Sequence, residues 1–145
     1  MSAEGRPKVL LVNRNFMVRD DGMLLIIQRS LDDLNYPGLW EVAGGKVEIG
    51  QDLHQAREDE TLQETGLRVE VTVPVATIES KQIITGRYAG FLYLALFHVT
   101  KIVGGDLALS HEHHDHAWVT YDKLFDYNLT PEVRDAAKVL KNYLE

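Results

Sequence analysis

The sequence predicts a layered fold of the α+β or mixed α/β class, and three observations support this expectation. Several runs are rich in branched apolar residues, as is typical of strands, and two other segments have the apolar spacing of helices. Strands and helices do not alternate regularly along the chain. No internal repeat or long linker divides the 145 residues, so we expect a single domain over 1–145 with a loose tail at 1–6.

The first expected element is a β-hairpin with strands at 8–18 and 23–30, because the turn sequence RDDG separates two apolar runs. A loop-rich connection follows over 31–50, with a short strand in LWEV at 39–42. The remaining strands are expected at 69–79, 86–103 and 116–120.

Two helices are expected from the sequence, and for the first of them both ends are marked. The first is expected over 52–65, because Asp52 begins a capping-box pattern and Gly66 suits the left-handed position that ends a helix. The second begins in LTPEV, where Thr130 is the expected cap and Pro131 takes the first helical position. Its apolar residues recur at helical spacing, so we assign it a packing role.

The composition excludes several classes of function. The chain has no cysteine, which excludes disulfides, thiolate metal sites and thiol nucleophiles. A formal net charge of −7 argues against a protein that coats nucleic acid but leaves small anionic ligands open. The longest apolar run, at 88–99, is shorter than the roughly 18 residues of a membrane span. The first residues lack the apolar stretch of a signal peptide, so a cytoplasmic protein without membrane association is expected.

The first predicted helix carries acidic residues on the face that should enter the core. At about 100° per residue, that face consists of Leu53, Ala56, Glu60, Gln63, Glu64 and Leu67. A solvated charged face is the alternative, but it would place the carboxylates opposite the apolar residues. The Cβ atoms of Glu60 and Glu64 should lie about 5–6 Å apart, and two such carboxylates repel unless a cation lies between them. We therefore favour a site for a hard divalent ion such as Mg²⁺, which binds carboxylates and substrate phosphates.

The glycine-rich loop before this helix, GGKVEIG, is compatible with binding an anion. Gly44 and Gly45 allow a ligand to approach the backbone closely. Arg29 and Lys46 are candidates to pair with substrate phosphates, although the alternative of solvated surface cations stays open for both. The sequence thus predicts substrate binding by Arg29, Gly45 and Lys46.

The segment GGKVEIGQDLHQAREDETLQETGL resembles the Nudix box, G-x5-E-x7-R-E-U-x-E-E-x-G-U, where U is a bulky apolar residue. Gly45 matches the first glycine, and Glu60 and Glu64 match two of the acidic positions. Four positions depart from the pattern: Gln51 and Gln63 replace Glu, Asp59 replaces Arg, and Thr61 is polar where a bulky apolar residue is expected. Because an amide is a weaker oxygen ligand than a carboxylate, Gln63 should weaken metal binding or reduce the number of metals bound.

The resemblance to the Nudix (MutT-like) hydrolases implies an α/β/α sandwich with a mixed β-sheet between helices. It also implies hydrolysis of the pyrophosphate linkage of a nucleoside diphosphate joined to another moiety, with Mg²⁺ or Mn²⁺ as cofactor. By resemblance, Glu60 and Glu64 bind metal, helped by the carbonyl of Gly44. Glu112 lies six residues before Trp118, as a glutamate does in many members, and is expected to be a further ligand or the general base.

Several alternatives stay open. A Nudix-fold nucleotide-binding or regulatory module that has lost catalysis is the rival to an enzyme. The substrates that remain by elimination are nucleoside triphosphates, including oxidised ones. The His-rich segment HEHHDH at 111–116 is interpreted either as a zinc site or as a loop at the mouth of the active site. An exposed strand edge leaves a homodimer open.

Overall fold

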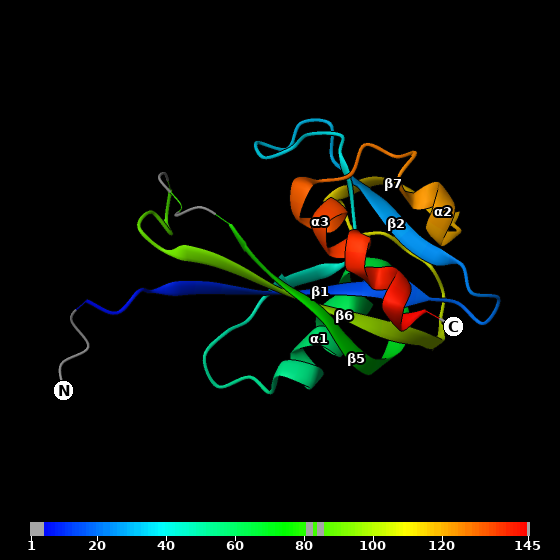
Figure 1. Cartoon of the computed structure of the whole chain (residues 1–145), viewed down its shortest axis with the longest axis horizontal. Coiled ribbons are helices and arrows are strands. Elements are labelled where there is room, and N and C mark those ends of the chain that lie inside the picture. The colour runs from blue at the N-terminus through cyan, green and yellow to red at the C-terminus, as the bar shows by residue number, and fades with distance from the viewer. Residues whose placement is uncertain (1–4, 81–82, 84–85, 145) are drawn as a thin grey trace.

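The computed structural model describes residues 5–80, 83 and 86–144. A mixed β-sheet forms its centre, and helices pack against it (Figure 1). The strands are β1 (Val9–Val18), β2 (Leu24–Arg29), β3 (Trp40–Glu41), β4 (Gly44–Lys46), β5 (Leu67–Ser80), β6 (Leu92–Gly105) and β7 (His113–Val119). The helices are α1 (Leu53–Thr65), α2 (Tyr121–Leu124), α3 (Pro131–Leu140) and the short 3-10 helix η1 (Lys141–Tyr143).

The sheet has the order β3-β2-β1-β6-β5, with β4 paired to β1 and β7 paired to β2. The pair β1 and β6 is parallel, and the other pairs are antiparallel. The predicted hairpin is present, since β1 and β2 pair across the turn at Val18 and Leu24. This mixed sheet with its helices confirms the predicted α/β fold class.

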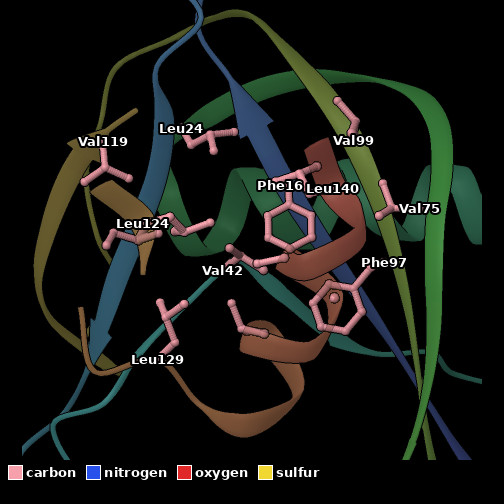
Figure 2. Packing of buried hydrophobic residues seen from close by; sticks show 14 of the residues in the cluster. Phe16, Leu24, Val42, Val75, Phe97, Val99, Val119, Leu124, Leu129 and Leu140 are labelled. Atoms are coloured by element: carbon pink, nitrogen blue, oxygen red, sulfur yellow. The ribbon is translucent and has the colours of Figure 1, made fainter. Parts of the chain in front are cut away.

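Two apolar clusters lie on opposite faces of the sheet, because successive side chains of a strand point to opposite sides. Phe16 belongs to the larger cluster, where its ring lies 5.5 Å from that of Phe97 (Figure 2). This cluster also buries the apolar stripe of α3, as predicted, including Val133 and Leu140. Met17, the next residue after Phe16, belongs to the smaller cluster on the other face. The two faces are therefore built differently, and α1 lies on the second.

Several boundaries differ from the sequence predictions. Residues 86–91 form a turn and not the start of a strand, because Gly86 and Gly90 adopt positive φ angles of 80° and 91°. The strand β4 forms inside the glycine-rich segment, where a loop was expected. β7 begins at His113, so most of the predicted loop 111–116 is strand. Of the predicted tail, residues 1–4 lie outside the described residues, while Gly5 and Arg6 are exposed.

The ends of α1 agree with prediction in most respects. The side chain of Asp52 accepts hydrogen bonds from the backbone amides of His54 and Gln55, and Gly66 has the left-handed φ of 76°. The capping box predicts that the side chain of Gln55 reaches back to Asp52. Its side-chain amide instead donates a hydrogen bond to Oδ1 of Asp59 at 2.9 Å. Among the helices of the described residues, none is long and apolar enough to cross a membrane.

Candidate active site

The helix α1 rests on the sheet through polar side chains, which corrects the apolar stripe predicted for it. Leu53 and Leu62, at the two ends of the helix, are exposed. The residues of α1 that are buried are Ala56, Arg57, Thr61 and Thr65. The helix is thus rotated relative to the sequence prediction, with a cation on its inner face.

Arg57 connects α1 to the strands beneath it. Its guanidinium donates hydrogen bonds to Asn13 Oδ1 at 2.8 Å and to the carbonyl oxygen of Leu96 at 3.2 Å. It also donates to the backbone carbonyl of Arg14. Burial lowers the pKa of Arg57 to about 10, against the charge of Glu60, which raises it. These directional contacts fix how α1 is turned about its own axis.

This orientation of α1 places acidic residues along a cleft of about 870 Å³. The described residues that line the cleft include seven acidic side chains but three from lysine or arginine. The acidic ones are Asp33, Glu41, Glu48, Asp59, Glu60, Glu64 and Glu112, and the basic ones are Arg14, Arg29 and Lys46. A polyphosphate would therefore meet a negative surface.

Gly44 and Gly45 allow the backbone of β4 to lie against β1 and α1. A Cβ atom on Gly44 would lie 1.9 Å from the carbonyl oxygen of Asn13, on the paired strand β1. A Cβ atom on Gly45 would lie 2.7 Å from Oε2 of Glu60. Both glycines are therefore required by close packing, and Gly45 leaves room for the carboxylate of Glu60.

Glu60 and Glu64 lie in the cleft, where the nearby charges of Arg14, Arg57 and His113 do not offset the cost of burying their carboxyl groups. Burial raises the pKa of Glu60 to about 7, and it raises the pKa of Glu64 to about 7 as well. Oε2 of Glu60 is buried and has no hydrogen-bond partner in the described part of the chain. Ionised carboxylates in this setting are costly, and a bound cation would relieve the cost.

Glu41 lies on the cleft floor and is fully paired. Its carboxylate binds Arg29 at 3.1 Å, Arg14 at 3.5 Å and Nε2 of His113 at 2.9 Å. Burial alone would raise the pKa of Glu41. The hydrogen bond from His113 and the charges of the two arginines outweigh burial and lower this pKa to about 2. Glu41 is therefore ionised and held in place, unlike its neighbours on α1.

Comparison with known proteins decides the family. The NUDIX domain family model matches residues 6–143 of the chain. The chain belongs to the NUDIX domain family. CTP pyrophosphohydrolase of Escherichia coli (strain K12) is 31% identical over 115 residues, which cover 79% of each protein. Nucleoside triphosphatase NudI of Escherichia coli O81 (strain ED1a) is 27% identical over 128 residues, covering 85% of this chain and 91% of NudI.

Solved structures agree with this Nudix assignment. The crystal structure of the MutT protein from Methanosarcina mazei Go1 has a TM-score of 0.79 at 20% identity, and the match covers 95% of this chain and 96% of that one. The solution structure of the E. coli ORF135 protein has a TM-score of 0.73 at 26% identity, covering 95% and 92%. The first likeness concerns the fold alone. Together the comparisons confirm the family and enzyme class predicted from the sequence, a MutT-like Nudix hydrolase.

The structure brings the predicted site residues of this Nudix chain to one cleft but does not join them all. Glu60, Glu64 and Glu112 each line it, as do Gly44 and Gly45. Within residues 5–80, 83 and 86–144, no group of three or more His, Asp or Glu side chains lies close enough together to hold a metal ion. Glu112 is exposed, on the segment that leads into β7.

The two cations predicted to bind phosphate, Arg29 and Lys46, both line the cleft, but they differ in their exposure and in their contacts. Arg29 is bound to Glu41 and, at 2.8 Å, to Asp33, so its guanidinium is already engaged. Lys46 is exposed, and its ammonium lies 5.2 Å from the ring centroid of Tyr88. Lys46 is therefore better placed than Arg29 to contact a ligand.

The departures from the Nudix box have local partners in the structure. Gln51 accepts a hydrogen bond from the backbone amide of Glu48 at 2.7 Å, and Asp59 accepts one from Gln55. Gln63 is exposed at the edge of the cleft. The first two side chains thus organise the loop and the outer face of α1, and Gln63 alone of the three changes a position beside Glu64.

Sequence reasoning missed Arg14, Glu41 and His113. Glu41 had a signal, because it is a charged residue within the apolar strand sequence LWEV. His113 was included only as one of several histidines in 111–116. The structure separates these, since His113 is buried while His114 and His116 are exposed on β7. The histidines form no metal cluster among the described residues, which argues against the zinc interpretation.

Proposed function

We propose that this Nudix hydrolase cleaves the pyrophosphate linkage of nucleoside triphosphates, including oxidised ones, with Mg²⁺ or Mn²⁺ as cofactor. The observation that carries the proposal is the pair of partly buried carboxyl groups, Glu60 and Glu64, which line the cleft and whose burial raises the pKa of each to about 7. The relatives named as a CTP pyrophosphohydrolase and a nucleoside triphosphatase support this substrate class.

Two carboxylates and a main-chain carbonyl in the cleft are donors that suit a divalent cation. Oε2 of Glu60 has no hydrogen-bond partner among the described residues, and Gly45 lets it lie against the backbone of β4. Carboxylates and a main-chain carbonyl are the ligands that Mg²⁺ prefers in proteins. We therefore assign metal binding to Glu60, Glu64 and the carbonyl of Gly44, with Glu112 as a further ligand.

The acidic lining gives a second reason for metal dependence. With seven acidic residues against three basic ones, the cleft would repel a bare triphosphate. A divalent cation bound there would neutralise phosphate oxygens and lower the pKa of a bound water. The substrate is accordingly a metal complex of the nucleotide.

The protein groups have separate tasks in the proposed reaction. The exposed carboxylate of Glu112 accepts a proton from the attacking water, whose oxygen forms a bond to phosphorus. The bond from that phosphorus to the bridging oxygen breaks, which gives a nucleoside monophosphate and pyrophosphate. Lys46 at the cleft edge binds a phosphate oxygen of the substrate. Arg29 and Arg14 act indirectly, by holding Glu41.

The test is turnover on a panel of nucleoside triphosphates and their oxidised forms, with Mg²⁺ or Mn²⁺, measured as phosphate after addition of pyrophosphatase. Glu64→Gln should lower kcat by at least about a hundredfold. Glu70→Gln, which changes an exposed glutamate of β5, is the matched control and should leave kcat unchanged. Nucleotide binding without turnover on the whole panel would overturn the proposal and favour a binding module.

A further inference from the structure

We propose that His113 is a positioning residue that fixes the carboxylate of Glu64 relative to Glu41 and to the segment that carries Glu112. The inference rests on the proposed function of the cleft. It concerns a residue that belongs to none of the positions of the Nudix box and that the proposed reaction does not use.

The geometry of the imidazole supports this role. Nε2 of His113 lies 2.9 Å from Oε2 of Glu41 and 3.7 Å from Oε1 of Glu64. The side chain is 3% exposed, so water cannot readily replace either contact. A single ring nitrogen thus lies between two carboxylates that belong to different elements, β3 and α1.

The direction of the hydrogen bond follows from its acceptor. Glu41 is paired with two arginines and is therefore a carboxylate, which can only accept. Nε2 of His113 must then carry the hydrogen. The other ring nitrogen, Nδ1, is buried and has no hydrogen-bond partner among the described residues. The orientation of the ring is accordingly set by Glu41, and this places an N–H dipole beside Glu64.

Backbone contacts hold the same segment but do not reach the carboxylates. The amide of Ser110 donates to the carbonyl oxygen of Glu64 at 3.0 Å, and the amide of Ser30 donates to that of Glu112 at 3.1 Å. These bonds fix the course of the main chain. The side chain of His113 is what connects this segment to the acidic group of Glu64, so its loss should affect ligand geometry more than chain path.

A purely structural role makes a different prediction from a positioning role. If His113 only fills space, a phenylalanine of similar ring size should serve and a glutamine should not. If the donor to Glu41 matters, glutamine should serve, because its amide nitrogen can reach the position of Nε2, and phenylalanine should not. The two hypotheses therefore make opposite predictions about which of the two variants keeps native-like behaviour.

The experiment measures Mn²⁺ binding to the protein without nucleotide, by electron paramagnetic resonance, together with kcat and KM for the best nucleotide. His113→Phe is expected to weaken Mn²⁺ binding about tenfold and to lower kcat more than it raises KM, as is usual when a group that orients a metal ligand is removed. His113→Gln should keep both within about threefold of the native protein, and His116→Gln, an exposed change on the same strand, should have no effect.

Circular dichroism establishes that each variant is folded. Should His113→Phe not fold, His113→Asn takes its place, because the shorter amide cannot reach Glu41, and the same loss is expected. Native-like Mn²⁺ binding by His113→Phe, or an equal loss in His113→Gln and His113→Phe, would overturn the inference.

Glu64→Gln separates this inference from the function on which it rests. If Glu64→Gln abolishes Mn²⁺ binding while His113→Phe does not affect it, His113 is no positioning residue and the proposed function stands. If Glu64→Gln leaves Mn²⁺ binding intact, the metal site is elsewhere and both proposals fail.

Discussion

Glu41 and Glu64 lie on either side of His113, and their side chains are 4% and 13% exposed, so Glu41 is buried and Glu64 partly buried. Their electrostatic states nevertheless differ. The pKa of Glu41 is lowered to about 2, while burial raises the pKa of Glu64 to about 7. The difference is the hydrogen bond from His113 together with the charges of Arg14 and Arg29, which all contact Glu41 directly. Burial alone therefore does not identify a ligand; what identifies it is a burial cost that the protein's own partners do not offset.

The comparison divides the cleft into a floor and a wall. The floor, at Glu41, is satisfied by the protein itself and holds neighbouring segments together. The wall, at Glu60 and Glu64, carries acidic groups whose burial the nearby cations of the protein do not offset. We expect substitutions on the floor to affect mainly stability and substitutions on the wall to affect mainly metal binding.

The largest expected effect is on the floor. Glu41→Gln removes the negative charge from between Arg14 and Arg29. Each partly buried cation then keeps one carboxylate partner only among the described residues, Glu132 for Arg14 and Asp33 for Arg29. The unfolding free energy should fall by about 3 kcal/mol at pH 7. Chemical denaturation measures this loss, with Glu70→Gln as the exposed control; a loss below about 0.5 kcal/mol would show that the floor is not held by charge.

The second expected effect is stabilisation of the wall by metal, and it depends on pH. Glu60 and Glu64 have folded-state pKa values raised to about 7, so the stability they contribute is present below their unfolded values and lost as pH rises through 7. Without metal, the unfolding free energy should decline between pH 5 and pH 8. Mg²⁺ at a hundred times its dissociation constant should restore about 2.7 kcal/mol at pH 8.

Thermal melting with and without Mg²⁺ at pH 8 measures this gain, and melting at pH 5.5 supplies the control, because both carboxyl groups are then mostly protonated. Mg²⁺ should raise the melting temperature less at pH 5.5 than at pH 8. An increment that is equal at both pH values would contradict the division, since it would mean that the cation does not bind where these carboxyl groups ionise.

A substitution on the wall should have the opposite sign to the one on the floor. Glu64→Gln replaces a carboxylate that is charged at a cost above pH 7, so the metal-free protein should gain about 1 kcal/mol in unfolding free energy at pH 8. The gain should disappear near pH 4.5, where the native glutamate is protonated. Denaturation at the two pH values measures it, and destabilisation at pH 8 would place Glu64 with the floor.

The smallest expected effect concerns the altered box position. Gln63→Glu adds a carboxylate at the cleft edge, one residue before Glu64, and should tighten Mn²⁺ binding about fivefold because a charged oxygen is the stronger ligand. Titration calorimetry with Mn²⁺ measures the change, and Gln55→Glu on the exposed side of α1 is the control. Unchanged affinity would place residue 63 outside the metal's reach.

The acidic residues of the wall could be predicted from the sequence, but the contacts of Glu41 on the floor could not. Glu60 and Glu64 could be predicted because their spacing of four is local to one helix, and the glycines before them follow a contiguous pattern. The contacts of Glu41 join residues 27 positions apart in the case of Arg14 and 72 in the case of His113. Helix and strand periodicities relate only residues close together in the chain, so these pairs could not be predicted from a single sequence.

The errors in the predicted fold also come from contacts between residues far apart in the sequence. The residues of β4 have low strand propensity, and they pair with β1 because their lack of side chains permits close approach. The inner face of α1 was assigned to apolar residues, whereas Arg57 occupies it with hydrogen bonds to the strands. In both places tertiary contacts override the preference that the residue type would express alone.

The polar seating of α1 has a consequence for protein engineering. A slip of one residue would turn the helix by about 100° and carry Glu60 out of the cleft. The hydrogen bonds from Arg57 to Asn13 and to the carbonyl of Leu96 fix the rotation of α1 about its axis, and they lie between the helix and the sheet. Leu62, which is 41% exposed on the other side of the helix, takes no part in these contacts. A fluorescent probe or a tethering group could be attached at that position while Glu60 and Glu64 keep their orientation toward the cleft.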